Sequence, residues 1–152
     1  MATMKERTWE RHSNPWSVWT RVLTNPLVYL PVWNRSWRQA IPVGVWFLLN
    51  PRLFPPPKDV SSWATRSVLG EQLWTRKLRA ELPMSINIFS ALFFLVALYS
   101  AYARRLRDLI TFGGLALVFK LWFLARMVAY YDEYLARPWR RRLRGSWVSR
   151  RH

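Results

Sequence analysis

Lys120 is the residue whose type and position most directly suggest chemistry, because it lies in the middle of the apolar stretch from 109 to 131. A lysine at the centre of a bilayer costs about 2.5 to 3.5 kcal/mol on insertion scales, so it is by default paired or functional. We expect Lys120 to lie within a turn of the membrane surface and to extend its amine to the headgroups. The less favoured alternative is a buried ion pair with Glu71 as the acid, and the candidates for an intramembrane or interfacial ion pair are Lys120, Glu71 and Arg126.

Other signatures of catalysis are missing from the sequence. The two histidines, His12 and His152, lie near opposite ends of the chain, and no nucleophile motif, zinc motif or phosphate-binding glycine loop occurs. The chain has no cysteine, which excludes disulfides and thiolate metal sites. We therefore expect no catalytic residue, no cofactor and no metal.

The segment 137–152 is a second candidate site, with seven arginines and two tryptophans. Beside a membrane helix such residues bind anionic headgroups, each contributing on the order of 1 kcal/mol. The same composition is typical of nucleic-acid binding through phosphate contacts and base stacking, an alternative that we regard as less favoured. The residues expected to bind lipid or a partner protein are Arg137, Arg140, Arg141, Arg142, Arg144, Trp139 and Trp147.

The overall composition favours a membrane protein. Hydrophobic residues make up 51% of the chain, and Lys and Arg outnumber Asp and Glu by 24 to 8, which gives a net charge of +16. Apolar segments with cationic flanks suit a membrane protein or a nucleic-acid binder better than a cytosolic enzyme. The first residues are charged and lack an apolar core, so we expect no cleaved secretory signal.

Two strong transmembrane helices are predicted, at about 86–103 and 109–131. The first is uncharged, and at about 1.5 Å per residue it nearly spans a hydrocarbon core of roughly 30 Å. The connector between them is so short that the two helices must form an antiparallel hairpin. The alternative for such a segment is a buried helix of a soluble protein.

The N-terminal half contains two weaker apolar segments, at about 16–33 and 37–50. Pro26 and Pro31 make a long straight helix unfavourable in the first of them. We expect a second hairpin that is kinked or shallow, and either re-entrant or spanning. Two and four membrane crossings both fit this pattern.

The sequence after the second weak segment predicts where the chain leaves the membrane. Proline cannot continue a helix, and the residue before it is pushed out of helical geometry. Asn50, Pro51 and Arg52 are therefore expected to form a stop at the cytoplasmic interface.

An amphipathic helix is predicted in the basic connector 52–83, within VLGEQLWTRKLRAEL, and we expect it on the membrane surface or against the hairpins. Its apolar positions near one face are Val68, Leu69, Leu73 and Leu82.

The charge distribution predicts an orientation. The connector contributes six cations and the 137–152 tail seven, against three in the loop 104–107. The positive-inside rule then places the connector, the tail and both termini in the cytoplasm. We expect an integral protein of the cytoplasmic membrane of a prokaryote.

Four stretches resemble one family: NPWSVWTR at 14–21, NPRLFPPP at 50–57, SWATRSVLGEQLW at 62–74 and KLWFLARMV at 120–128. They are similar to small uncharacterised prokaryotic membrane proteins, a family catalogued only as a domain of unknown function. The resemblance covers most of residues 11–134. It implies an integral membrane protein and implies no activity.

These observations predict an all-α, small polytopic membrane protein of two helical hairpins. Residues 1–136 would form a single integral membrane domain, and 137–152 a cytoplasmic Arg/Trp-rich tail. We expect a non-catalytic accessory or scaffold component that contacts anionic lipid and possesses surfaces for other membrane protein subunits. The alternatives are a membrane-tethered nucleic-acid binder, and a small transporter or membrane enzyme centred on Lys120.

Overall fold

The computed structural model describes residues 11–57, 59–75 and 82–136, and every regular element in these ranges is a helix. The elements are α2 (Pro15–Thr24), the 3-10 helix η1 (Asn25–Val28), α3 (Tyr29–Trp33), α4 (Trp37–Leu53), α5 (Trp63–Thr75), α6 (Leu82–Tyr102) and α7 (Leu106–Ala136). The predicted all-α fold class is confirmed.

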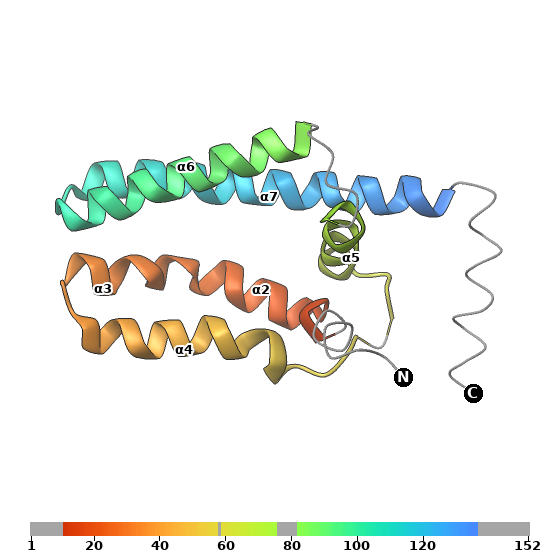
Figure 1. Cartoon of the computed structure of the whole chain (residues 1–152), viewed down its shortest axis with the longest axis horizontal. Coiled ribbons are helices and arrows are strands. Elements are labelled where there is room, and N and C mark those ends of the chain that lie inside the picture. The colour runs from red at the N-terminus through yellow and green to blue at the C-terminus, as the bar shows by residue number, and fades with distance from the viewer. Residues whose placement is uncertain (1–10, 58, 76–81, 137–152) are drawn as a thin grey trace.

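The helices form two layers (Figure 1). The segment α2–η1–α3 runs back along α4 in one hairpin, and α6 runs back along α7 in the other. The turns of both hairpins lie at the same end of the molecule. Near the opposite end α5 crosses between the layers and packs against both α2 and α7.

The first arm of the N-terminal hairpin is kinked, as its prolines predict. Asn14 caps α2 by accepting a hydrogen bond of 2.9 Å from the backbone N–H of Trp16 through Oδ1, and Pro15 fills the first turn, where no N–H is needed. Pro26 then lies in the first turn of η1. The change from α to 3-10 geometry and back divides this arm into three short pieces.

The second arm, α4, continues past the predicted stop. Pro42 and Pro51 both lie inside the helix, which ends at Leu53. Each proline lacks an N–H and so removes one backbone hydrogen bond from the helix. Phe54 is the first extended residue, with φ −95° and ψ 145°, the geometry that a following proline, here Pro55, favours. The expectation that the helix ends at Asn50 and Pro51 was therefore wrong.

The C-terminal hairpin is longer than the sequence predicts. α6 begins at Leu82, with Pro83 in its first turn, where proline is tolerated. α7 extends from Leu106 to Ala136, which leaves only residues 103–105 for the turn. Both helices are long and apolar enough to cross a membrane.

The connector helix α5 does not use the predicted leucine face. Its buried side consists mainly of small and polar residues together with Val68 and Trp74, whereas Leu82 is exposed at the start of α6. At Gly70 an added Cβ would lie 2.0 Å from the carbonyl oxygen of Met127, so the backbones of α5 and α7 are nearly in contact. Small residues permit this crossing, and leucines there would hold the helices apart.

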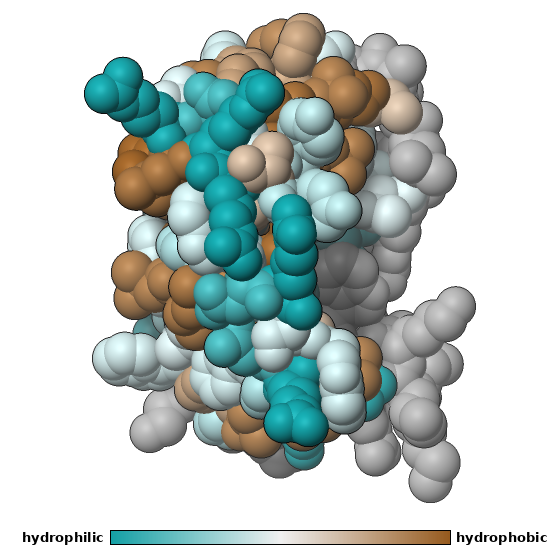
Figure 2. Space-filling model, turned by 90° about the vertical axis from the view of Figure 1, so that its left-hand side faces the viewer, coloured by the Kyte–Doolittle hydropathy of each residue, from teal (hydrophilic) through white to brown (hydrophobic). Residues whose placement is uncertain are grey.

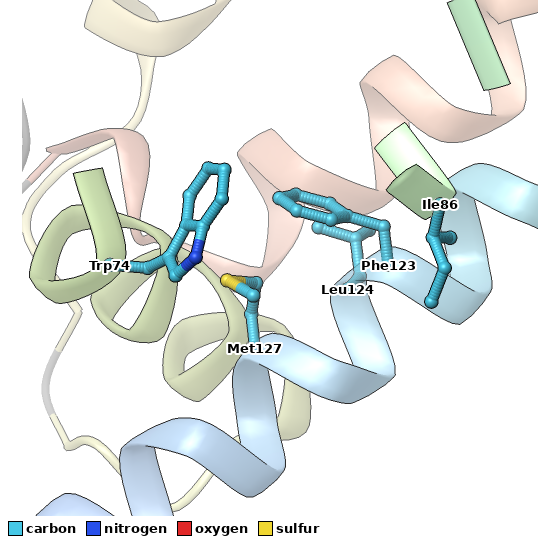
Figure 3. Packing of buried hydrophobic residues seen from close by; sticks show 5 residues of the cluster. All are labelled: Trp74, Ile86, Phe123, Leu124 and Met127. Atoms are coloured by element: carbon cyan, nitrogen blue, oxygen red, sulfur yellow. The ribbon is translucent and has the colours of Figure 1, made fainter. Parts of the chain in front are cut away.

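The hydrophobic core is divided into small clusters where elements meet. The largest joins Trp74 of α5 and Ile86 of α6 to the α7 residues Phe123, Leu124 and Met127 (Figure 3). The Trp74 and Phe123 rings meet edge to face, with centroids 5.8 Å apart. A second cluster links Val18 of α2 to α5, and a third links Tyr29 of α3 to α6.

Candidate functional site

Four titratable side chains form a charged cluster where α2, α5 and α7 approach one another. The cluster comprises His12, Arg21 of α2, Glu71 of α5 and Lys120 of α7. Arg21 Nη1 lies 3.1 Å from His12 Nδ1. The charge of Glu71 interacts electrostatically with Arg21, and the charge of Lys120 interacts electrostatically with His12. The cluster thus connects one hairpin, the crossing helix and the other hairpin.

His12 is held in its neutral form within this cluster. Its pKa is lowered from 6.5 to about 4, mainly by burial and also by the positive charges of Arg21 and Lys120. An arginine has only donors to offer, so Nδ1 of His12 accepts the hydrogen bond from Arg21 and Nε2 carries the proton.

Lys120 makes its closest described contact with an aromatic ring rather than an acid. Its Nζ lies 4.8 Å from the centre of the Phe123 ring, a cation–π geometry. Within the described residues no ion pair joins it to Glu71. The alternative of a Lys120–Glu71 ion pair is therefore not found among the described residues, where Glu71 acts on Arg21 instead. That Lys120 extends its amine to the headgroups stays a prediction.

A second polar group, which we call the asparagine clasp, fastens α2 to α4. Asn50 is fully buried; its Oδ1 accepts a hydrogen bond of 3.0 Å from Ser17 Oγ, and its Nδ2 donates one of 2.9 Å to Thr20 Oγ1. One turn earlier in α4, Trp46 Nε1 donates a bond of 2.8 Å to Thr24 Oγ1. Every bond of the clasp lies within the N-terminal hairpin.

The sequence matches the family of unknown function DUF6653 over residues 2–144. This chain belongs to DUF6653. No curated protein and no solved structure matches it. The family match extends past Ala136 and includes residues 137–144, the first half of the predicted tail.

In this DUF6653 protein the residues of the predicted interface stop contact the start of the chain. Asn50 belongs to the clasp and faces α2, and its level relative to a membrane stays a prediction. Arg52 is exposed, and its carbonyl oxygen accepts a hydrogen bond of 3.3 Å from Arg11 Nη1. Asn14 Nδ2 donates to the Pro55 carbonyl at 2.8 Å. The proline block is thus tied back to the start of α2.

The remaining predicted residues lie outside both polar groups. Arg126 is exposed on α7, away from the buried side of that helix, and is not part of the charged cluster. The described residues contain no group of three or more His, Asp or Glu side chains placed to hold a metal ion. The tail candidates, which run from Arg137 to Trp147, fall outside the described residues.

Sequence reasoning missed His12, Arg21 and the clasp. His12 looked isolated because its partners come from distant parts of the chain. The clasp did leave a readable signal: Ser17, Thr20 and Thr24 repeat at helical spacing and place three hydroxyls on one face of α2.

Proposed function

We propose that this DUF6653 protein is a non-catalytic integral membrane protein, an accessory or scaffold component that contacts anionic lipid and other membrane proteins. The observation that carries the proposal is the distribution of apolar and polar side chains. Large apolar side chains face outward on both hairpins, while Ser17, Asn50 and Thr65 are fully buried.

The outward-facing apolar residues occur on every long helix of the two hairpins. Of the apolar stretches in α6 and α7 only 22% and 17% are buried, whereas a core helix of a soluble protein is mostly buried. In water such a surface would be a severe aggregation liability, and in a bilayer it is the expected one. Representative exposed residues are Leu23, Ile41, Val45, Leu48, Ile88, Leu92, Leu95, Ile110 and Val118.

We further propose that all four arms cross the membrane, with the connector and tail in the cytoplasm. Two observations support four crossings: the hairpins lie alongside each other with their turns at one end, and α4 alone is 17 residues long, or about 26 Å. The turn end carries Arg35 and Arg38 as well as the three arginines of the 104–107 loop. The thirteen cations of the connector and tail still outnumber these five.

Carbonate extraction of membranes from cells that express the full chain tests the proposal. We expect the protein to remain in the membrane pellet, because its outward apolar surface is buried in lipid. Release into the soluble fraction would refute an integral membrane protein. A control peripheral protein in the same cells should be released.

The charged cluster favours one second candidate function, a small transporter or membrane enzyme centred on Lys120. Charged groups placed between membrane helices commonly mark a substrate or proton path. The test is Lys120→Met in a strain that depends on this protein. A variant that keeps both the wild-type stability and the wild-type phenotype would leave this function without support.

Nucleic-acid binding by the 137–152 tail is the less favoured alternative. Deletion of the tail should then abolish salt-dependent binding of DNA or RNA by the purified protein. Binding that is unchanged by the deletion would exclude the tail as the site.

A further inference from the structure

The two hairpin turns are closed by the same backbone motif. After α3, the N–H of Arg35 donates to the Val32 carbonyl at 3.2 Å, and the N–H of Ser36 to the Pro31 carbonyl at 2.9 Å. After α6, Arg104 and Arg105 repeat this pattern with the carbonyls of Ala101 and Ser100, at 3.1 and 2.9 Å. Both turns are Schellman motifs, which satisfy the last carbonyls of a helix.

The residue at the left-handed position of each motif is an arginine. Arg35 has φ 49° and Arg104 has φ 56°, and they are the two non-glycine residues with positive φ in the described part of the chain. Glycine usually fills this position because a Cβ is unfavourable there. The fold alone therefore favours glycine at both sites, and the arginines must be explained by what their side chains do.

These arginines belong to a larger surface, which we call the arginine face, at the turn end of the molecule. Figure 2 views this end and shows long hydrophilic side chains extending across it. The only described carboxylate there is Asp108, 4.0 Å from Arg105. The residues of the arginine face are Arg35, Arg38, Arg104, Arg105 and Arg107, and all of them are exposed.

One contact holds the two turns together across this face. Arg35 Nη2 donates to the Tyr102 carbonyl at 3.3 Å, and its guanidinium lies 4.8 Å from the centre of the Tyr102 ring. This contact joins the N-terminal hairpin to the end of α6. The arginines of both turns are therefore held on one surface instead of being carried by independent loops.

Exposed aromatic and aliphatic side chains flank the arginine face on the same helix ends. Trp37 starts α4, Tyr99 and Tyr102 end α6, and Leu106 starts α7, and each is more than half exposed. An apolar belt below a layer of cations matches the order of acyl chains and phosphates at a membrane surface. A soluble polyanion would match the cations but leave this flanking belt exposed to water.

We propose that the arginine face binds the phosphate groups of anionic phospholipids. The proposal rests on the integral membrane location proposed above and identifies a specific lipid site distinct from the 137–152 tail. Guanidinium groups present paired N–H donors that match phosphate oxygens, and weak hydration favours their use at interfaces. The exposed Arg38, Arg104 and Arg107 bind the phosphates, while Arg35 holds the two turns together.

The test uses the full chain purified in an uncharged detergent and titrated with short-chain phosphatidylglycerol, with phosphatidylcholine of the same chain length for comparison. Binding is followed by native mass spectrometry. We expect phosphatidylglycerol to be retained preferentially by the wild type. Arg38→Gln combined with Arg107→Gln should weaken this retention at least about tenfold.

The matched control is Arg52→Gln combined with Arg126→Gln, which removes the same charge from exposed positions away from the face. This pair should change retention by less than about threefold. Equal losses in the two pairs would show an effect of net charge alone and overturn the proposal. Wild-type affinity in the first pair would overturn it as well.

Arg104→Gly separates lipid binding from folding. Glycine suits the left-handed position, so this variant should unfold at the same or a higher temperature than the wild type while retaining less phosphatidylglycerol. Retention equal to the wild type would count against the proposal. Binding of soluble polyphosphate that is tighter than binding of phosphatidylglycerol in the wild type, and that is lost in the Arg38/Arg107 variant, would assign the face to a soluble polyanion instead.

The two proposals can fail independently. Wild-type protein released by carbonate would refute the membrane location itself. Wild-type protein that stays in the pellet, but whose lipid retention does not depend on the arginine face, would refute only the lipid site.

Discussion

Asn50 joins α2 to α4 through both ends of its amide, entirely out of contact with water. We expect Asn50→Ala to lower the free energy of unfolding by about 1–3 kcal/mol, because it leaves the Ser17 hydroxyl buried without its partner. Chemical unfolding of the full chain in detergent measures the change. Gln39→Ala is the control: it removes an exposed bond to Asn34 and should cost no more than about 0.5 kcal/mol.

His12 gives the molecule a pH dependence. Its pKa is about 4 in the folded protein and 6.5 when unfolded, so between these values the unfolded chain binds more protons. Stability should therefore be complete above pH 6.5 and fall as the pH drops towards 4, by at most about 3 kcal/mol. The positive charges of Arg21 and Lys120 act on His12, and Glu71 acts on Arg21.

The contribution of His12 is isolated by comparing unfolding curves of the wild type and His12→Gln at pH 4.5, 5.5 and 7. The acids of the chain titrate in both proteins, so the difference between the two curves reports on the histidine alone. The difference should change steadily with pH. A constant difference would mean that His12 titrates normally in the folded state.

At the scale of elements, the crossing of α5 over α7 depends on Gly70. Alanine there would place a Cβ 2.0 Å from the Met127 carbonyl oxygen, a backbone atom that cannot turn aside. We expect Gly70→Ala to destabilise the protein by about 1–3 kcal/mol or more, as overpacking does. Thermal unfolding in detergent measures the loss.

Gly114 provides the matched control for Gly70. It lies inside α7 and has nothing within 4 Å of an added Cβ. Gly114→Ala should leave the protein unchanged or stabilise it by up to about 1 kcal/mol, because alanine is the better helix former. Destabilisation of similar size in both variants would contradict the close crossing.

The elements that could be predicted are those specified by local sequence. The lengths of the apolar runs predict α6 and α7, and Pro26 and Pro31 predict the broken first arm. What could not be predicted depends on contacts between distant segments. The burial of Asn50 requires knowing that α4 packs on the hydroxyl face of α2, and the small-residue face of α5 is explained only by its crossing of α7.

The charged site was predicted only in part, for the same physical reason. Lys120 stood out because charge in an apolar context is costly, and Glu71 was named as an acid that could pair with it; both belong to the cluster. Arg21 and His12 lie outside the strongest apolar segments. A charged residue there is not unusual, so neither of them was singled out. Arg126 is a charged residue of α7, as Lys120 is, but its side chain is exposed and faces away from the cluster.

At the scale of the whole molecule, the hairpin turns and the proline block lie at opposite ends. If the arms span the bilayer as proposed, cysteines introduced at positions 52 and 105 should react with membrane-impermeant maleimide from opposite sides. Because the chain contains no cysteine, each single-cysteine variant reports on one site. Labelling of both positions from the same side would overturn the topology.

The asparagine clasp also bears on how the protein is made. All of its donors and acceptors lie between Ser17 and Asn50, so they can pair as soon as α4 has left the ribosome. The buried amide and hydroxyls of this hairpin form hydrogen bonds with one another. They therefore do not remain without partners while the second half of the chain is translated. The cluster around Arg21, by contrast, is complete only when Lys120 has been synthesised, so we expect the two halves to assemble late in biogenesis.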